Sequence, residues 1–117
     1  MKEKRTTRTG PLFKTGIPEL LLLRLLSEKE MYGYEIVQAI RERTAEMIAL
    51  GEGVLYPALH ALEAAGALRS RRRTVAGRTR VYYAATARGR RRLGALTSEW
   101  NRMSSVVRLV LKEEANG

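Results

Sequence analysis

The alternation of apolar and polar residues predicts three short helices, a β-hairpin and one long helix, in that order. A leucine-rich segment over 19–27 is apolar on most sides and predicts a buried helix, with Pro18 near its start. Isoleucine and valine at helical spacing predict a second helix over 32–46. A third helix is predicted from residue 53 or 54 to 65, and Gly66 fits the position that ends it.

The third predicted helix carries two stripes with different chemistry. Leu55, Leu59 and Leu62 recur at i, i+4 and i+7, so they form an apolar stripe for the core. A polar stripe runs beside it and consists of Tyr56, His60 and Glu63. A helix anchored by its leucines would leave the polar stripe free to contact another molecule.

The second half of the chain predicts a β-hairpin followed by the long helix. Two runs rich in β-branched and aromatic residues, 67–75 and 79–85, are joined by the short connection Ala76-Gly77-Arg78. Thr86 is placed to cap a helix over 87–114. The apolar positions of this helix are separated by three and four residues, as in a coiled-coil seam: Leu93, Leu96, Trp100, Met103, Val107 and Val110. Because this is more apolar surface than one small domain needs, we expect self-dimerisation, and the alternative is packing on the helix's own core.

The composition indicates one small domain without catalytic chemistry. The chain has 117 residues, of which 44% are hydrophobic, and it contains no Cys, one His and no Asp. These absences exclude a disulfide framework, a Ser-His-Asp triad and a zinc site with two His. No apolar run is long enough to span a membrane, and no secretory signal follows the basic first ten residues. We therefore expect a cytoplasmic, non-enzymatic protein with no cofactor, no metal and no membrane partner.

The positive charge is concentrated in one segment. The chain carries 22 Lys and Arg against 12 acidic residues, a net charge of +10. Ten arginines and no acid lie between Arg69 and Arg92, and the remaining 12 basic and 12 acidic residues balance. Clustered arginines favour polyanions, above all the phosphates of nucleic acid. The alternative, a solvated basic face kept for solubility, does not need ten arginines free of acids.

The predicted elements divide the chain into four parts. Residues 1–16 are basic and read as a flexible arm, which either lies along DNA or is a disordered tail or cloning remnant. Residues 17–86 form a DNA-binding domain in which two helices joined by a turn make a helix-turn-helix and the basic hairpin makes a wing. Residues 87–114 form a dimerisation helix, and 115–117 are a tail. The fold class is thus mainly α with a small β-ribbon, a winged helix-turn-helix followed by a long C-terminal dimerisation helix.

Several linked motifs resemble the PadR family of winged-helix transcriptional regulators, in its smaller subfamily with a single C-terminal helix. These motifs are Met31-Tyr32-Gly33-Tyr34-Glu35-Ile36, Gly53-Val54-Leu55-Tyr56-Pro57-Ala58-Leu59, Leu62-Glu63-Ala64-Ala65-Gly66, Arg80-Val81-Tyr82-Tyr83 and Thr86-Ala87-Arg88-Gly89. The resemblance covers about 19–111. It implies a homodimer that binds a palindromic operator in double-stranded DNA, usually as a repressor that an effector releases. The alternative is a nonspecific, architectural nucleic-acid-binding protein without an effector.

The charge pattern and the family resemblance together indicate which residues contact DNA or an effector. The candidate DNA contacts are Tyr56, His60, Arg71, Arg73, Arg78 and Arg80. Neighbouring strand residues face opposite sides, so Arg71, Arg72 and Arg73 cannot all face DNA. The arginines of 88–92 either contact the DNA backbone or are solvated. By the resemblance, Trp100 stands where related regulators line a ligand pore at the dimer centre, so Trp100 and Met103 are candidates for binding a planar aromatic effector, and core packing is the alternative.

Overall fold

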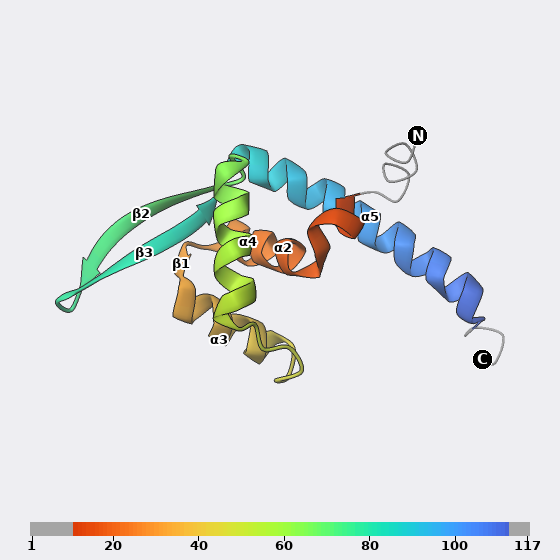
Figure 1. Ribbon diagram of the computed structural model, residues 1–117, viewed down its shortest axis with the longest axis horizontal. Helices are drawn as coiled ribbons and strands as arrows, with labels where there is room; N and C mark the ends of the chain where they lie inside the picture. Colours follow the sequence, from red (N-terminus) through yellow and green to blue (C-terminus); the bar gives the residue numbers. More distant parts are fainter. Residues whose placement is uncertain (1–10, 113–117) are drawn as a thin grey trace.

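The computed structural model describes residues 11–112 and shows a helical fold with one small antiparallel sheet (Figure 1). Its elements, in chain order, are α2 (Pro11–Glu28), β1 (Met31–Tyr32), α3 (Gly33–Arg43), α4 (Glu52–Ala64), β2 (Leu68–Val75), β3 (Arg78–Ala85) and α5 (Ala87–Leu111). This order of helices, hairpin and long C-terminal helix confirms the predicted winged helix-turn-helix class.

The first helix is longer than its leucine pattern indicates. α2 begins at Pro11 and bends at Gly16, whose φ of 80° and ψ of 175° are not helical, before Pro18 starts the leucine-rich half. Residues 11–16 of the predicted flexible arm therefore belong to α2 and its kink, whereas residues 1–10 lie outside the described residues. Glycine suits the kink because a side chain is strained at this positive φ.

The core forms where the leucine-rich half of α2 meets α3, α4, the sheet and α5. Leu22, Leu23 and Leu26 of α2 are fully buried, as is the predicted leucine stripe of α4 (Leu55, Leu59 and Leu62). Burial of these side chains is the main favourable contribution to folding. It also fixes which face of α4 points outward.

The sheet has three strands rather than the predicted two. Its order is β1-β3-β2, and β1 pairs Met31 with Tyr83 and Tyr32 with Tyr82. The hairpin is also tighter than predicted, because Arg78 is already paired with Val75 and only Ala76 and Gly77 form the turn. These two turn residues have φ of 52° and 79°, the pair of left-handed conformations typical of a type I′ hairpin turn. The predicted connection Ala76-Gly77-Arg78 was therefore one residue too long.

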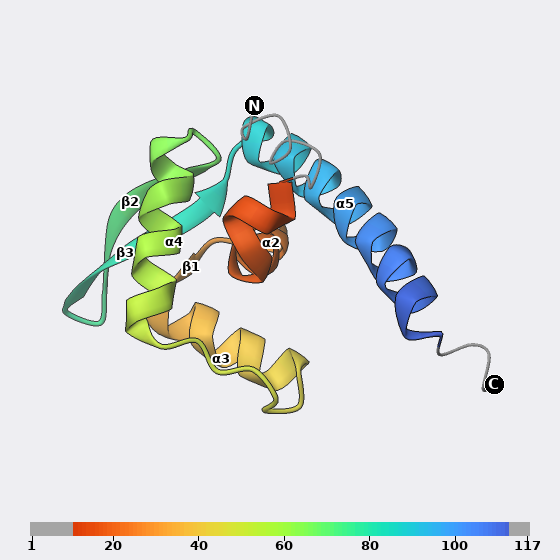
Figure 2. The ribbon, with the colours of Figure 1, turned by 45° about the vertical axis from the view of Figure 1, so that its right-hand side comes forward.

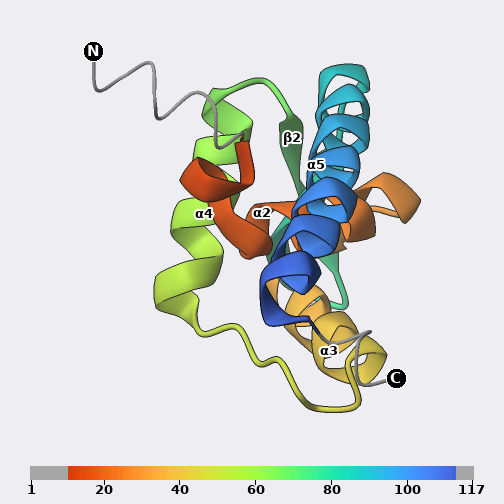
Figure 3. The same cartoon turned by 90° about the vertical axis from the view of Figure 1, so that its right-hand side faces the viewer.

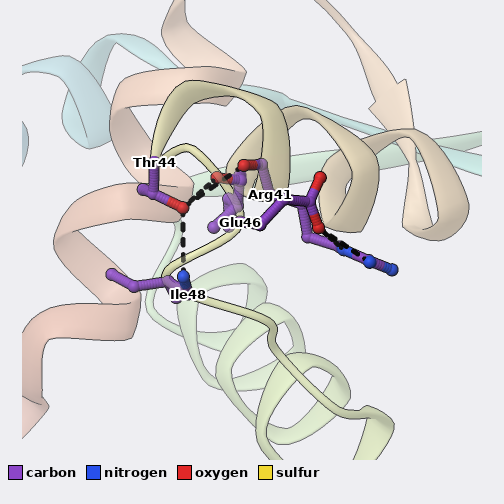
Figure 4. Close-up of polar contacts among 5 residues, drawn as sticks. Arg41, Thr44, Glu46 and Ile48 are labelled. Carbon is purple, nitrogen blue, oxygen red and sulfur yellow. Dashed lines mark hydrogen bonds and ion pairs between the residues drawn. The ribbon is translucent and has the colours of Figure 1, made fainter.

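A hydrogen-bonded turn separates the two helices of the helix-turn-helix (Figure 4). The Thr44 hydroxyl donates to the Ile40 carbonyl at 2.7 Å and accepts from the Ile48 amide at 3.1 Å. Arg41 Nε donates to Glu46 Oε1 at 2.8 Å across the same turn. Ala45 and Glu46 adopt positive φ, so α3 ends at Arg43 rather than at the predicted residue 46.

The last helix begins in a tightly bonded junction with the end of α4. Thr86 caps α5 as predicted, because its hydroxyl accepts from the Gly89 amide at 3.0 Å. The same hydroxyl donates to the Gly66 carbonyl at 2.6 Å, and the Thr86 amide donates to Ala67 at 3.0 Å. The first turns of α5 pack against α2, and the rest of the helix extends away from the other elements (Figures 1 and 2). No helix within residues 11–112 meets the length and apolarity needed to cross a membrane.

Candidate nucleic-acid interface

α4 and the β2–β3 hairpin lie next to each other in the fold (Figures 1, 2 and 3). α4 stands against the start of β2, where Ser70 Oγ donates to Glu63 Oε2 at 2.6 Å. Glu63 therefore has an internal partner and is not a free member of the predicted polar stripe. His60 remains exposed.

A hollow between α4 and β3 brings together candidate residues from both elements. Tyr56, His60 and Arg80 line it, and the rings of Tyr56 and His60 lie 6.2 Å apart. Buried Tyr83 forms part of its wall. Burial, with smaller effects from Glu63 and Tyr56, raises the pKa of Tyr83 above its ordinary value, so this phenol stays neutral at neutral pH.

The position of Tyr56 depends on the absence of a side chain at Gly33. A Cβ on Gly33 would overlap the Tyr56 hydroxyl and lie 3.1 Å from the ring carbon that carries it. The two motifs Tyr32-Gly33-Tyr34 and Leu55-Tyr56-Pro57 are thus linked by one close contact between α3 and α4.

Gly33→Ala is expected to destabilise the protein by about 1 kcal/mol, because the exposed Tyr56 side chain must swing away from α3 to make room for the added methyl group. Most of the conflict is with the phenolic oxygen, so Gly33→Ala combined with Tyr56→Phe should recover part of the loss. Chemical denaturation of the single and double variants measures both effects. Equal losses with and without the hydroxyl would contradict the contact.

The wing presents two faces that differ in charge. Leu68 is buried opposite Ala85, so Ser70, Arg72 and Thr74 share the side of β2 that faces α4. The opposite, outer face carries most of the charge, and its arginines are Arg69, Arg71, Arg73, Arg78 and Arg80. Of these, Arg80 also lines the hollow beside α4. Arg71 and Arg73 therefore point away from the α4 side, whereas Arg72, which sequence reasoning did not select, lies on it. Side chains alternate along a strand, so an apolar Leu68 facing the core would have predicted that Arg72, four residues later, lies on the same side.

The carboxylate of Glu30 binds two arginines of the outer face, Arg71 and Arg73. Arg71 donates to Glu30 from Nε at 2.6 Å and from Nη2 at 2.8 Å, and Arg73 Nη1 lies 3.5 Å from the same group. The hydrogen bond from Arg71, with the nearby positive charges, holds the pKa of Glu30 below its usual value. The same hydrogen bond and the negative charge of Glu30 raise the pKa of Arg71. The forked contact ties the wing to the segment just before β1.

Tyrosine rings support Arg73 and one further arginine of the outer face, Arg80. The Arg73 guanidinium lies 4.5 Å from the ring centre of Tyr82, and that of Arg80 lies 4.4 Å from Tyr32. The two rings themselves are 5.3 Å apart in an edge-on arrangement. Stacking of this kind restricts the guanidinium while leaving its N–H groups available at the edge.

Glu30→Gln is expected to loosen the wing without unfolding the protein. The amides of residues 69–73 should exchange with solvent faster, because the forked bond from Arg71 is lost. Since the pKa of Glu30 is lowered in the folded state, its stabilising contribution is full above the usual value of 4.5 and is lost as the pH falls through the lowered pKa. Glu46→Gln, which removes the partner of Arg41 in the α3–α4 turn, is the matched control and should leave wing exchange unchanged. Identical exchange in the two variants would contradict this role for Glu30.

Three of the four arginines at the start of α5 have partners within the protein. Arg90 Nη1 donates to the Ser27 carbonyl at 2.9 Å, and Arg92 Nη2 pairs with buried Glu19 at 3.0 Å. Arg88 Nη1 lies 3.4 Å from the Ala65 carbonyl. These internal partners explain three positive side chains at a helix N-terminus, where the helix dipole disfavours them.

The predicted seam of α5 divides between the protein's own core and its surface. Leu96 is fully buried, and Leu93 and Met103 pack against the core. Leu96 is therefore packed in the chain's own core, which at this position is the alternative to the predicted dimer contact. Beyond it, large apolar side chains are exposed: Trp100, Val106, Val107, Leu109, Val110 and Leu111. Trp100, Met103 and Val107 line a groove on this distal part of the helix.

Comparison with known proteins identifies the family. Residues 22–95 match the transcriptional regulator PadR-like family. The chain belongs to the PadR-like family. A transcriptional regulator of Mycobacterium tuberculosis is 35% identical over 99 residues, which cover 85% of this chain and 87% of that protein. The resemblance predicted from the motifs is thereby confirmed, and the family consists of transcriptional regulators rather than enzymes.

Solved structures of PadR-like and related regulators share the fold. A PadR family transcription regulator from Clostridium difficile is 31% identical, with a TM-score of 0.69 over 82% of this chain and 99% of that one. A transcriptional regulator from Clostridium thermocellum is 32% identical, with a TM-score of 0.72 over 77% of this chain and 85% of that one. The chain is thus a DNA-binding regulator of the PadR-like family.

Proposed function

We propose that this PadR-like regulator is a cytoplasmic homodimer that binds a palindromic operator as a repressor and is released by a small planar molecule. One observation carries the proposal: α4 and the arginine-rich wing lie side by side and are both exposed. A major groove admits one α-helix, and arginines beside it suit phosphates or the adjacent minor groove. In this arrangement residues 17–86 bind DNA and the C-terminal part, 87–114, supplies the dimer contact through α5.

The proposed DNA contacts come from both elements. Tyr56 and His60 lie at the hollow beside α4, and Arg78 and Arg80 extend from the wing. Arg71 and Arg73 remain predicted DNA contacts. Their guanidinium groups already lie beside the Glu30 carboxylate, so a DNA phosphate would have to compete with Glu30 for them. A forked carboxylate bond and a forked phosphate bond use the same N–H groups of arginine.

The proposed dimer uses the distal part of α5. At 3.6 residues per turn, the apolar side chains from Trp100 to Leu111 cover about half of the helix circumference. A two-stranded coiled coil buries a narrower stripe, so the partner must cover this surface with more than its own α5. Val107 and Val110 belong to both the predicted seam and this exposed surface.

Selection of genomic fragments by the purified protein tests the proposal. We expect enriched fragments to share a two-fold symmetric sequence with half-sites about one or two helical turns apart. Sedimentation should give a dimer, and Val110→Glu should give monomers that lose the preference for symmetric sites. A monomeric protein that binds scrambled duplexes as tightly as enriched ones would support the nonspecific architectural alternative instead.

The proposed effector site is tested by the fluorescence of Trp100, the single tryptophan of the chain. Two symmetric indoles near a dimer axis can enclose a flat aromatic molecule. Planar aromatic compounds are therefore expected to quench this emission saturably and to release bound DNA. Absence of quenching across a varied set of such compounds would instead favour a packing role for Trp100.

A further inference from the structure

The outward face of α4 carries an apolar strip that the core does not use. The strip consists of Gly53, Val54, Pro57, Ala61 and Ala64, all of them exposed. At helical spacing these residues lie opposite the buried leucine stripe, and Val54 retains 47% of its surface. None of them has a side chain that can donate or accept a hydrogen bond.

The polar residues of α4 lie on one flank of this strip. His60 and Tyr56 border it, Glu63 is bonded to Ser70, and Glu52 is in the first turn. The helix therefore offers few hydrogen-bonding groups for reading base edges. A Cβ at Gly53 would meet nothing within 4 Å, so the first turn is open to a close approach.

The surroundings of the strip indicate what covers it. The wing beside α4 carries six arginines between Arg69 and Arg80, which favours a polyanion over an apolar protein surface. The major groove of DNA displays one apolar group, the 5-methyl of thymine, and small apolar side chains contact it. Small side chains along the strip also let the helix backbone approach the bases.

We infer that α4 reads thymine methyl groups through this strip, so that each operator half-site contains thymines recognised by apolar contact. The inference rests on the proposed function, because it assigns α4 to the major groove. His60 supplies the hydrogen-bonding contact at the edge of the strip, and arginines of the wing supply the phosphate contacts that position the helix.

Replacing thymine by uracil in the bound site tests the inference, because this removes the methyl group and leaves the base-pairing edge unchanged. The probe is a duplex selected from a random pool by the full chain, with each thymine replaced in turn. Burial of one methyl group is worth about a fourfold change in affinity, so at least one thymine per half-site should show a loss of about that size. Uracil in the flanking sequence should have no effect.

Two variants test whether the loss of affinity caused by uracil depends on the apolar strip of α4. Val54→Thr and Ala61→Ser keep the size of the side chain nearly constant but add a hydroxyl. In one of them the uracil penalty at the contacted thymine should disappear, whereas Ala95→Ser, an exposed position on α5, should retain it. A sequence-specific complex that is indifferent to uracil at every position overturns the inference alone. A pool with no enriched sequence overturns both the inference and the proposed function.

Discussion

Replacing Gly89 with alanine is expected to lower the free energy of unfolding by about 3 kcal/mol, and to lower the melting temperature by on the order of 10 °C. A Cβ at this position would overlap the backbone carbonyl oxygen of Ala67 and lie 3.0 Å from its carbon. The same carbonyl accepts the Thr86 amide, so it cannot turn away without losing a hydrogen bond. Relief therefore requires α5 to move away from the end of α4.

Gly94→Ala provides the matched control in the same helix. A Cβ at Gly94 meets nothing within 4 Å, so this change should stabilise the protein by about 0.5–1 kcal/mol through helix propensity alone. Denaturant unfolding of the two variants separates propensity from contact. If both glycines respond alike, the close approach of α5 to Ala67 is not what requires glycine at position 89.

The junction also shows how far the sequence can be interpreted. The cap at Thr86 follows from local chemistry, because a threonine before a helix accepts an amide within its own first turn. The closeness of Gly89 to Ala67 depends on how α4 and α5 meet, which no local pattern encodes. The motif Thr86-Ala87-Arg88-Gly89 was therefore recognisable from the sequence, whereas the physical reason for its glycine required the structure.

The same distinction applies to the wing. The run of arginines and the β-branched pattern predict a charged hairpin, and alternation predicts that neighbouring arginines face opposite sides. Which of them face α4 depends on the burial of Leu68, and the partner of Arg71 is Glu30, 41 positions earlier. β1 was missed because two residues are too few to produce a pattern, although they align Tyr32 with Tyr82.

The long helix gives a third case. Spacings of three and four residues correctly predict a continuous helix with one apolar side, but they do not say what covers that side. Leu96 is buried by the chain's own α2 and its neighbours, whereas Val110 retains 77% of its surface. Tertiary packing thus divides a uniform sequence pattern into an internal part and a part available to a partner.

Removing two arginines from the end of the wing is expected to weaken DNA binding on the order of a hundredfold. Arg78 starts β3 beside the turn, and Arg80 is held against the Tyr32 ring, so Arg78→Ala with Arg80→Ala deletes two charge-assisted contacts to phosphate. Each phosphate contact releases condensed counterions. The slope of log affinity against log salt should therefore fall by about two per subunit, as measured by fluorescence anisotropy over a salt series.

A control of equal charge separates contact from long-range attraction. Arg24→Ala with Arg91→Ala also removes two positive charges, but these exposed side chains lie on α2 and α5, outside the wing. Since long-range attraction is screened within about 10 Å at 0.1 M salt, this variant should bind DNA with nearly the wild-type salt slope. Equal slopes of log affinity against log salt for the two double variants would mean that the wing assists DNA binding only through long-range attraction. A lower slope for the wing variant alone would instead place Arg78 and Arg80 within bonding distance of phosphate, next to the groove that receives α4.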